Sequence, residues 1–225
     1  PTELETLSGS VRSMRSDDVA GAASLHRSVF PDYFLTHMGQ RFLERFYADF
    51  VDRGTNYGFV AVSGGELAGA VVGTVDSGGF YDGFYRRHFP SLALALAGRI
   101  LVDPYIRRNL AGRMGHVRHA LRSIGARRQE VSPADKPADP GQVPARLLSI
   151  GVHPDWRGSG LAEQLVDRYC KALWEDGWER VGLSVRPENQ RAIAFYEKTG
   201  WQRAGASARS VQYTRSTMPA TGGPR

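Results

Sequence analysis

A glycine-bearing loop between an apolar run and a helix is the part of this sequence with the clearest chemical meaning. Residues 147–152 are apolar with β-branched members and fit a buried strand, which Pro154 ends because proline cannot donate a hydrogen bond to a ladder. The loop Arg157-Gly158-Ser159-Gly160 follows, and apolar residues three to four apart then indicate a helix that ends near Gly177. The unpaired backbone N–H groups at such a helix N-terminus can bind an anion such as a phosphate.

Two other interpretations of the loop remain open on its residues alone. A Gly-x-Gly sequence after a strand can be a tight turn with no ligand. The loop can also be compared with a dinucleotide-binding fingerprint, but that pattern needs a third glycine where Glu163 stands. It also needs an acidic residue at the end of a second strand. The loop therefore indicates an anion site or a plain turn more than a dinucleotide site.

The spacing of the loop is similar to that of a known motif. Arg157, Gly160 and Ala162 are arranged as Arg-x-x-Gly-x-Ala, which resembles the pyrophosphate-binding motif of the GNAT superfamily of N-acyltransferases. A second block resembles the closing signature of that family, in which an asparagine, an alanine and a Phe-Tyr pair precede Gly-Trp: Asn189, Ala192, Phe195, Tyr196, Gly200 and Trp201. A shorter match lies at the start of the chain, at Val11, Arg12, Met14 and Asp18. We identify the chain by resemblance as a member of this superfamily.

The resemblance implies an α/β (α+β) fold around a mixed, mostly antiparallel sheet. That sheet has about seven strands, splayed between the fourth and fifth and flanked by helices. Residue patterns predict strands near 10–14, 57–62, 67–75, 147–152 and 181–185, and a final hairpin of 201–204 with 209–214. They predict helices from Asp17 or Asp18 to Val29 and over 39–51. We expect one domain over residues 10–215 and a disordered tail over 216–225.

A helical insertion between the third and fourth strands is the main departure from the minimal family pattern. It occupies residues 78–145, where the family has almost none. Residues 104–125 are expected to form an amphipathic helix with a basic face that includes Arg107, Arg108 and Arg113, and a proline-rich loop follows. Such a face is solvated surface, a docking surface for an anionic acceptor, or a contact with an anionic membrane surface. His116 and His119 have no carboxylate or cysteine companions, so we expect no metal site.

Composition narrows the class of protein. A chain of 225 residues, 41% of them hydrophobic, can bury a full core, and one cysteine, Cys170, excludes an internal disulfide. No run reaches the roughly 18 apolar residues of a membrane span, and no signal-peptide pattern is present, so we expect a cytoplasmic protein. The net charge is +6, but the basic residues of the insertion are not interleaved with exposed aromatic residues, so nucleic acid is not an expected partner. The protein is expected to be a monomer or a homodimer.

The resemblance implies acetyl-CoA as the acyl donor and assigns residues to it. The pantetheine arm would bond to the backbone of the fourth strand at Ile150, Gly151 and Val152. The pyrophosphate would lie on the loop Arg157, Gly158, Ser159, Gly160, Leu161 and Ala162. Asn189 would contact the arm or hold the loop after the fifth strand, with Phe195 and Tyr196 beside the thioester.

Tyr196 is the expected general acid. A phenol of pKa about 10 can protonate a leaving thiolate whose conjugate acid has a pKa near 8.5. The alternative for Tyr196 is a core aromatic beside Phe195. A backbone N–H of the fourth strand, at Val152 or its neighbour, would stabilise the oxyanion. No general base is evident, because Ser149 and Ile150 stand where some members have a glutamate. Asp32 is named for deprotonating or binding the ammonium, and Tyr33, Phe34 and Ser149 for binding the acceptor.

The expected reaction is direct attack of a primary amine on acetyl-CoA in a ternary complex. The basic insertion favours an anionic small-molecule acceptor, such as a nucleotide-linked amino sugar. Enzymes that modify antibiotics, proteins or peptides are alternatives, although a basic surface disfavours cationic aminoglycosides. An alternative of another class is a non-catalytic acyl-CoA-binding module, against which Tyr196 and Asn189 argue.

Overall fold

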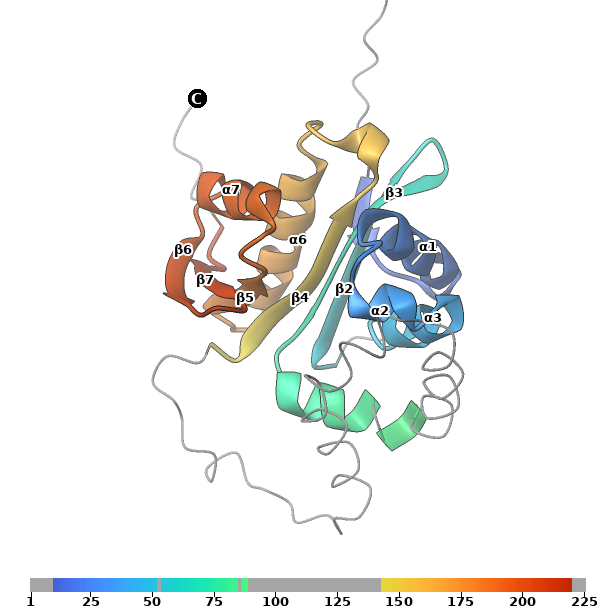
Figure 1. Ribbon diagram of the computed structural model, residues 1–225, viewed down its shortest axis with the longest axis horizontal. Helices are drawn as coiled ribbons and strands as arrows, with labels where there is room; N and C mark the ends of the chain where they lie inside the picture. The colour runs from blue at the N-terminus through green and yellow to red at the C-terminus, as the bar shows by residue number, and fades with distance from the viewer. Residues whose placement is uncertain (1–9, 52–53, 85, 89–142, 220–225) are drawn as a thin grey trace, which may run out of the picture.

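The computed structural model of the chain describes residues 10–51, 54–84, 86–88 and 143–219 (Figure 1). The predicted amphipathic helix, its basic face, the histidine pair and most of the proline-rich loop lie outside these residues. Predictions about them therefore stay predictions. Within the described residues, no helix is long and apolar enough to cross a membrane.

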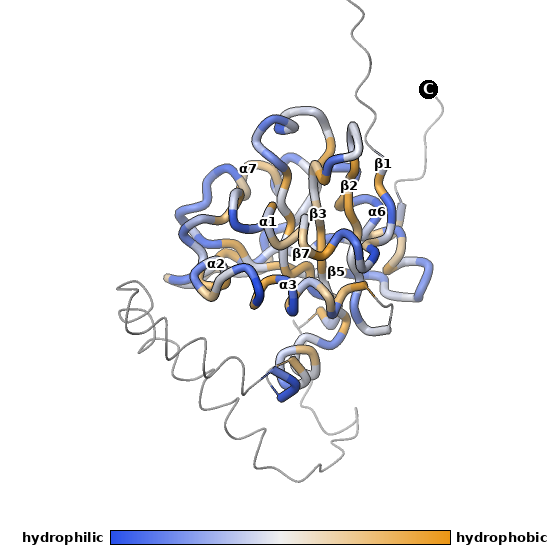
Figure 2. Tube along the Cα trace, turned by 90° about the vertical axis from the view of Figure 1, so that its right-hand side faces the viewer, coloured by the Kyte–Doolittle hydropathy of each residue, from blue (hydrophilic) through white to orange (hydrophobic). Residues whose placement is uncertain are grey.

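The described part of the chain forms a seven-stranded sheet in the order β1-β2-β3-β4-β5-β7-β6. Only β4 and β5 are parallel, and the other neighbours are antiparallel, as the resemblance implies. The tube of Figure 2 is orange along β2, in keeping with a strand covered on both faces. The strands are β1 Ser10–Ser13, β2 Asn56–Ser63, β3 Glu66–Thr74, β4 Ala145–Val152, β5 Arg180–Val185, β6 Gln202–Ala206 and β7 Val211–Ser216.

Helices cover the sheet on both faces (Figure 1). On one face lie α1 (Val19–Val29), α2 (Phe34–His37) and α3 (Gln40–Ala48), and on the other lies α6 (Leu161–Glu175), with α7 (Gln190–Lys198) after β5. Each face has its own apolar core. Residues 77–84 and 86–88, at the start of the predicted helical insertion, are helical, and Phe80 and Phe84 of this segment pack into the α1–α3 core.

The sheet forks between β4 and β5. Their pairing is limited to two residue pairs, Ala145 with Val181 and Arg146 with Gly182. Beyond that point β4 stays bonded to β3 and β5 to β7, so the two parallel strands diverge. β4 also carries a bulge at the fork, because Gly73 lies opposite Leu147 while Val72 lies opposite Ser149, which leaves Leu148 as an extra residue. The predicted splay is confirmed.

A buried tyrosine holds the fork. Tyr169 of α6 is 0% exposed, and its hydroxyl donates a hydrogen bond of 3.0 Å to the carbonyl of Arg146, the last residue of β4 that pairs with β5. The phenol reaches that carbonyl by passing over Gly73 of β3. A Cβ at position 73 would lie 2.6 Å from Cζ of Tyr169 and closer still to its hydroxyl. The same Cβ would also clash with the carbonyl oxygen of Arg146, so Gly73 is required by the approach of both Tyr169 and the β4 backbone.

The folded domain extends past its predicted end at residue 215. Ser216 is the last residue of β7, and Thr217 is buried. The Thr217 N–H donates to the carbonyl of Glu179 at 3.0 Å, and its hydroxyl donates to the carbonyl of Trp178. The prediction of a tail from residue 216 is therefore wrong for its first two residues, because side-chain and backbone bonds fix Thr217 to the start of β5.

The variant Gly73→Ala tests the restraint at the fork. We expect it to lower the free energy of unfolding by about 3 kcal/mol, measured by urea denaturation, because the added methyl overlaps a well-packed phenol. In a Tyr169→Phe background the same substitution should cost about 1 kcal/mol less, since the hydroxyl that it meets is gone. Gly205→Ala is the matched control, because a Cβ in that strand meets its nearest atom at 3.8 Å and should cost little in either background. Additive losses for Gly73→Ala and Tyr169→Phe would contradict the contact.

Candidate active site

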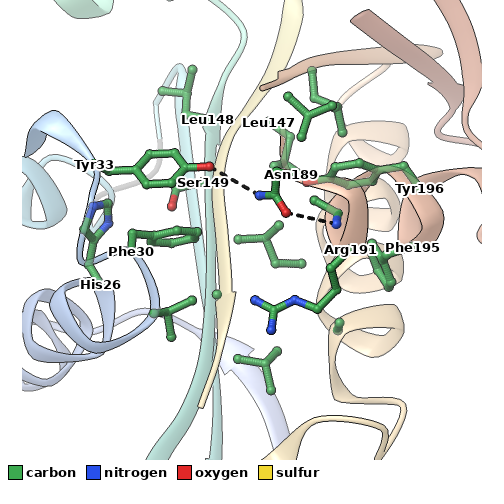
Figure 3. A pocket seen from close by; sticks show the side chains of 18 of the residues that line it. His26, Phe30, Tyr33, Leu147, Leu148, Ser149, Asn189, Arg191, Phe195 and Tyr196 are labelled. Atoms are coloured by element: carbon green, nitrogen blue, oxygen red, sulfur yellow. Dashed lines mark hydrogen bonds between the residues drawn. The ribbon is translucent and has the colours of Figure 1, made fainter. Parts of the chain in front are cut away.

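A cavity of about 560 Å³ opens where β4 and β5 diverge. Its lining comes from β4, α1 and the residues after it, the start of α6, the end of β5, and α7. Figure 3 shows Ser149 and Leu147 of β4 between Tyr33 and Phe30 on one side and Asn189 and Tyr196 on the other. The cavity is therefore built from both halves of the forked sheet.

The edge of β4 that faces the cavity has unpaired backbone groups. His153 donates to the carbonyl of Ala68 at 2.8 Å, and in an antiparallel ladder every second residue bonds to the same neighbour. By that alternation Gly151 and Ser149, opposite Ala70 and Val72, bond to β3. Ile150 and Val152 therefore direct their N–H and C=O groups toward the open side, where an extended ligand can add as a strand.

The start of α6 presents a second set of unpaired amides. Within the described residues, the N–H groups of Gly158, Gly160, Leu161, Ala162 and Glu163 have no hydrogen-bond acceptor. Gly158 and Gly160 both have φ of 81°, and no atom lies within 4 Å of a Cβ built on either, so the left-handed backbone itself requires glycine there. These amides, at the positive end of a 15-residue helix, suit an anion.

Two residues predicted to bind the pyrophosphate, Arg157 and Ser159, make hydrogen bonds within the loop itself. The N–H of Arg157 donates to Pro154 at 3.2 Å, and the Ser159 hydroxyl donates to the carbonyl of Trp156 at 2.7 Å. Ser159 does not line the cavity, whereas Arg157, Gly158, Gly160, Leu161 and Ala162 do. Four cationic side chains line the cavity, Arg157, Arg186, Arg191 and Lys198, against one acidic residue among the described lining, Glu163. The electrostatic balance of the cavity favours a polyanionic ligand.

Tyr196 combines a buried ring with a hydroxyl in the cavity. Its side chain is 6% exposed and packs against Trp201 and Tyr213, with ring centroids 5.5 and 6.0 Å apart. The hydroxyl points toward the cleft (Figure 3). Burial, and to a smaller extent Tyr33, raises the pKa of Tyr196 above its ordinary value. The phenol is therefore a protonated hydrogen-bond donor at neutral pH. Its ring belongs to the core, and its hydroxyl lies at the cavity.

Asn189 joins the two sides of the cavity. Its Oδ1 accepts from the N–H of Ala192 at 3.1 Å and so caps α7, and its Nδ2 donates to the hydroxyl of Tyr33 at 3.3 Å. The Tyr33 ring also lies 4.3 Å from the guanidinium carbon of Arg186 and 5.0 Å from the Phe30 ring. The segment after α1 thus contacts the segment after β5 across the cavity.

The structure separates the predicted acceptor residues. Tyr33 and Ser149 line the cavity, as do Ile150, Gly151, Val152, Asn189 and Phe195. Asp32 is exposed and outside the lining, and Phe34 packs toward the α1–α3 core instead. The ring of Tyr33 lines the cavity, whereas Asp32 lies in solvent, where its charge is hydrated.

Sequence reasoning missed His26 and Tyr47. His26 is 4% exposed and lines the cavity, and its Nδ1 lies 2.9 Å from the hydroxyl of Tyr47. Burial lowers the pKa of His26 to about 4, so the imidazole is neutral at pH 7. The position of His26 on the apolar face of α1 was its one signal, and that is also typical of a core histidine.

Two other groups of chemical interest have no part in the cavity. Cys170 is buried, and burial raises the pKa of its thiol to about 11, as an inert core thiol requires. No cluster of three histidine, cysteine or acidic side chains that could hold a metal ion occurs within the described ranges.

Comparisons with known proteins agree with this geometry. The model of the acetyltransferase (GNAT) family matches residues 20–201. An acetyltransferase of Sodalis glossinidius is 42% identical over 53 residues, which cover 24% of this chain and 37% of that protein. One of Pectobacterium atrosepticum is 42% identical over 53 residues, covering 24% and 38%.

Solved structures share the fold. The crystal structure of SsHAT has a TM-score of 0.58 at 23% identity and covers 94% of this chain and 99% of its own. The PaiA N-acetyltransferase of Thermoplasma acidophilum, in complex with coenzyme A, has a TM-score of 0.52 at 10% identity and covers 93% and 99%. With the family model spanning both the forked sheet and the glycine loop, the chain belongs to the acetyltransferase (GNAT) family.

Proposed function

We propose that this protein transfers the acetyl group of acetyl-CoA to the primary amine of a small-molecule acceptor. One observation carries the proposal: a single cavity joins the open edge of β4, the unpaired amides at the start of α6 and the hydroxyl of Tyr196. Those three features match the three parts of an acyl-CoA that need a partner, namely its amide-bearing arm, its phosphates and its sulfur.

The acyl donor would be held mainly by backbone groups. Ile150 and Val152 offer N–H and C=O groups to the amides of the pantetheine arm, as an added strand would. The N–H groups of Gly158 and of residues 160–163 would receive the pyrophosphate, with Arg157 adding positive charge. This arrangement binds an extended, anionic ligand in one direction, with the thioester end deepest in the fork.

The transfer would proceed by direct attack in a ternary complex. The amine nitrogen forms a bond to the thioester carbon, and the carbonyl oxygen takes up negative charge, which the N–H of Val152 would stabilise. The C–S bond then breaks, and the sulfur leaves as a thiolate that takes the proton of the Tyr196 hydroxyl. Phe195 would border the arm, and Asn189 would fix the segment that carries this chemistry.

The acidic residue of the described cavity lining, Glu163, lies in the first turn of α6, at the proposed phosphate site, so it is not placed to take the amine proton. Asp32 is exposed beside Tyr33, so a role for Asp32 in deprotonating the ammonium would run through water. Ser149 lines the cavity, which places a hydroxyl of β4 near the acceptor side. An amine that arrives neutral needs neither group.

The acceptor is proposed to be anionic, as a nucleotide-linked amino sugar is. The positive lining of the cavity supports this, and it disfavours polycationic antibiotics. Transfer to a protein or peptide amine is an alternative. A non-catalytic acyl-CoA-binding module is the alternative of another class, and it would bind acetyl-CoA without releasing thiol in the presence of any amine.

Substitution of Gly160 by aspartate tests the phosphate site. A carboxylate at the start of α6 should repel the pyrophosphate, and we expect the affinity for acetyl-CoA, measured by titration calorimetry, to fall by about 100-fold or more. Gly177→Asp is the matched control, because Gly177 has nearly the same φ, 83° against 81°, and no atom within 4 Å of its Cβ. Equal weakening by both variants would show that backbone strain, and not the phosphate contact, is responsible.

Replacement of Tyr196 by phenylalanine tests the general acid. The turnover number, measured by thiol release with a panel of primary amines, should fall by about 100-fold, while the dissociation constant of acetyl-CoA stays within about twofold. The control is Tyr213→Phe, whose ring packs on Tyr196 but whose hydroxyl bonds to Glu197 at 2.8 Å. Unchanged turnover in Tyr196→Phe would exclude Tyr196 as the proton donor.

A further inference from the structure

Arg186 is a fixed cation on the acceptor side of the cavity. It follows the last residue of β5, Val185, is half-buried and lines the cavity. Its guanidinium carbon lies 4.3 Å from the centre of the Tyr33 ring, whose hydroxyl is held by Asn189. Stacking fixes the plane of a guanidinium and leaves the N–H groups at its edge able to bind a planar anion in a bidentate manner. Arg186 has no carboxylate partner among the described residues.

The position of Arg186 separates it from the donor phosphates. Tyr33 belongs to the segment between α1 and α2, on the face of the sheet opposite α6 (Figure 1). The unpaired amides proposed to bind the pyrophosphate lie at the start of α6. An anion bound by Arg186 would therefore belong to the molecule that enters from the α1 side, which is the acceptor.

The walls on the α1 side are apolar and aromatic. They include Phe30, Tyr33, Leu35, Phe46, Tyr81 and Leu148. The rings of His26 and Phe30 lie 4.9 Å apart, and those of Phe30 and Tyr33 lie 5.0 Å apart, so they form one continuous surface (Figure 3). His26 is neutral at pH 7 because burial lowers its pKa to about 4. Such a surface favours an apolar, planar body over a polyhydroxylated one.

The charge of the lining disfavours two broad types of acceptor, and the volume of the cavity limits the size of the acceptor. A polyamine or an aminoglycoside would bring extra ammonium groups into a lining whose one acidic residue among those described, Glu163, lies at the start of α6. Those ammoniums would be buried without partners beside Arg186. The cavity of about 560 Å³ must also hold the thioester end of the donor, so the buried part of the acceptor is small.

From this geometry we infer that the acceptor is a small amine with an aromatic or similarly flat apolar body and one carboxylate-like group, and that Arg186 binds that group. The inference rests on the proposed function and narrows it: an aromatic amino acid fits the acceptor side better than a nucleotide-linked sugar does. It makes Arg186 a specificity-determining residue.

The test compares acceptors that differ only in charge. L-Phenylalanine, L-phenylalaninamide and spermidine are assayed by thiol release at saturating acetyl-CoA, with wild type and Arg186→Gln. We expect wild type to use L-phenylalanine with the lowest KM and spermidine least well. Arg186→Gln should raise the KM for L-phenylalanine by about 10- to 100-fold and that for the amide by less than about twofold. Comparing the two acceptors in both proteins cancels their different amine basicities.

Three controls test whether the effect on KM comes from the guanidinium of Arg186 and concerns the acceptor alone. Arg186→Lys keeps the charge without the planar fork and should restore part of the lost preference. Arg180→Gln removes the same charge from the other end of β5, where the side chain donates to Thr214 at 3.2 Å outside the cavity, and should change neither KM. The dissociation constant of acetyl-CoA, measured by calorimetry, should stay unchanged in Arg186→Gln.

Several results would overturn the inference. They are a preference for spermidine, an equal rise in both KM values in Arg186→Gln, or no transfer to any of the three probes by a protein that binds acetyl-CoA and acetylates other amines. In each of these cases the proposed acetyl transfer still stands. If the wild type binds no acetyl-CoA, the proposed function fails, and the inference falls with it.

Discussion

The hydrogen bond from Tyr169 to the Arg146 carbonyl fixes the place where β4 and β5 separate, and the cavity opens from that place. Two parallel strands that stayed paired along their length would satisfy each other's backbone groups and leave no opening. Here the pairing stops at Arg146 and Gly182, the bulge at Leu148 turns β4, and the phenol of α6 fixes the last paired residue. Gly73 is the sequence condition for this contact, because a side chain there would occupy the path of the phenol. The same helix that fixes the fork also begins with the unpaired amides, so one element sets both ends of the proposed donor site.

The two faces of the sheet then have different chemistry. The α6 side offers backbone N–H groups, which recognise phosphate and amide groups without regard to side chains. The α1 side offers aromatic rings, hydroxyl groups and Arg186, which are proposed to select the acceptor. Tyr196 lies between them, with its ring in the core and its hydroxyl in the cavity. Under the proposed function, this division would let one cavity bind the acyl donor through the backbone and select the acceptor through side chains.

Most of the fold and of the proposed donor site could be predicted from local pattern. The strand–loop–helix of β4 and α6 and the glycines of its loop are encoded by neighbours in sequence, and their positions agree with expectation. The short helix α2 carries no strong periodic signal and was missed, and the helix over 77–84 was expected only as part of a helical insertion without bounds of its own. Contacts between residues distant in sequence could not be predicted. In the sequence Tyr169 is one of several apolar positions of a helix, and no residue near Arg186 indicates that it stacks on Tyr33. Asp32 was chosen by position after a helix, whereas the rings beside it, and not the carboxylate, line the cavity.

Amide hydrogen exchange of the 15N-labelled protein, with and without acetyl-CoA, reports on each of the N–H groups proposed to bind the donor. We predict that acetyl-CoA newly protects the amides of Ile150, Val152, Gly158 and residues 160–163. We also predict that Ser149 and Gly151, already bonded to β3, change little, since their protection precedes binding. Protection of Ser149 and Gly151 with no change at Ile150 and Val152 would contradict the open-edge account. So would binding that leaves the start of α6 unprotected.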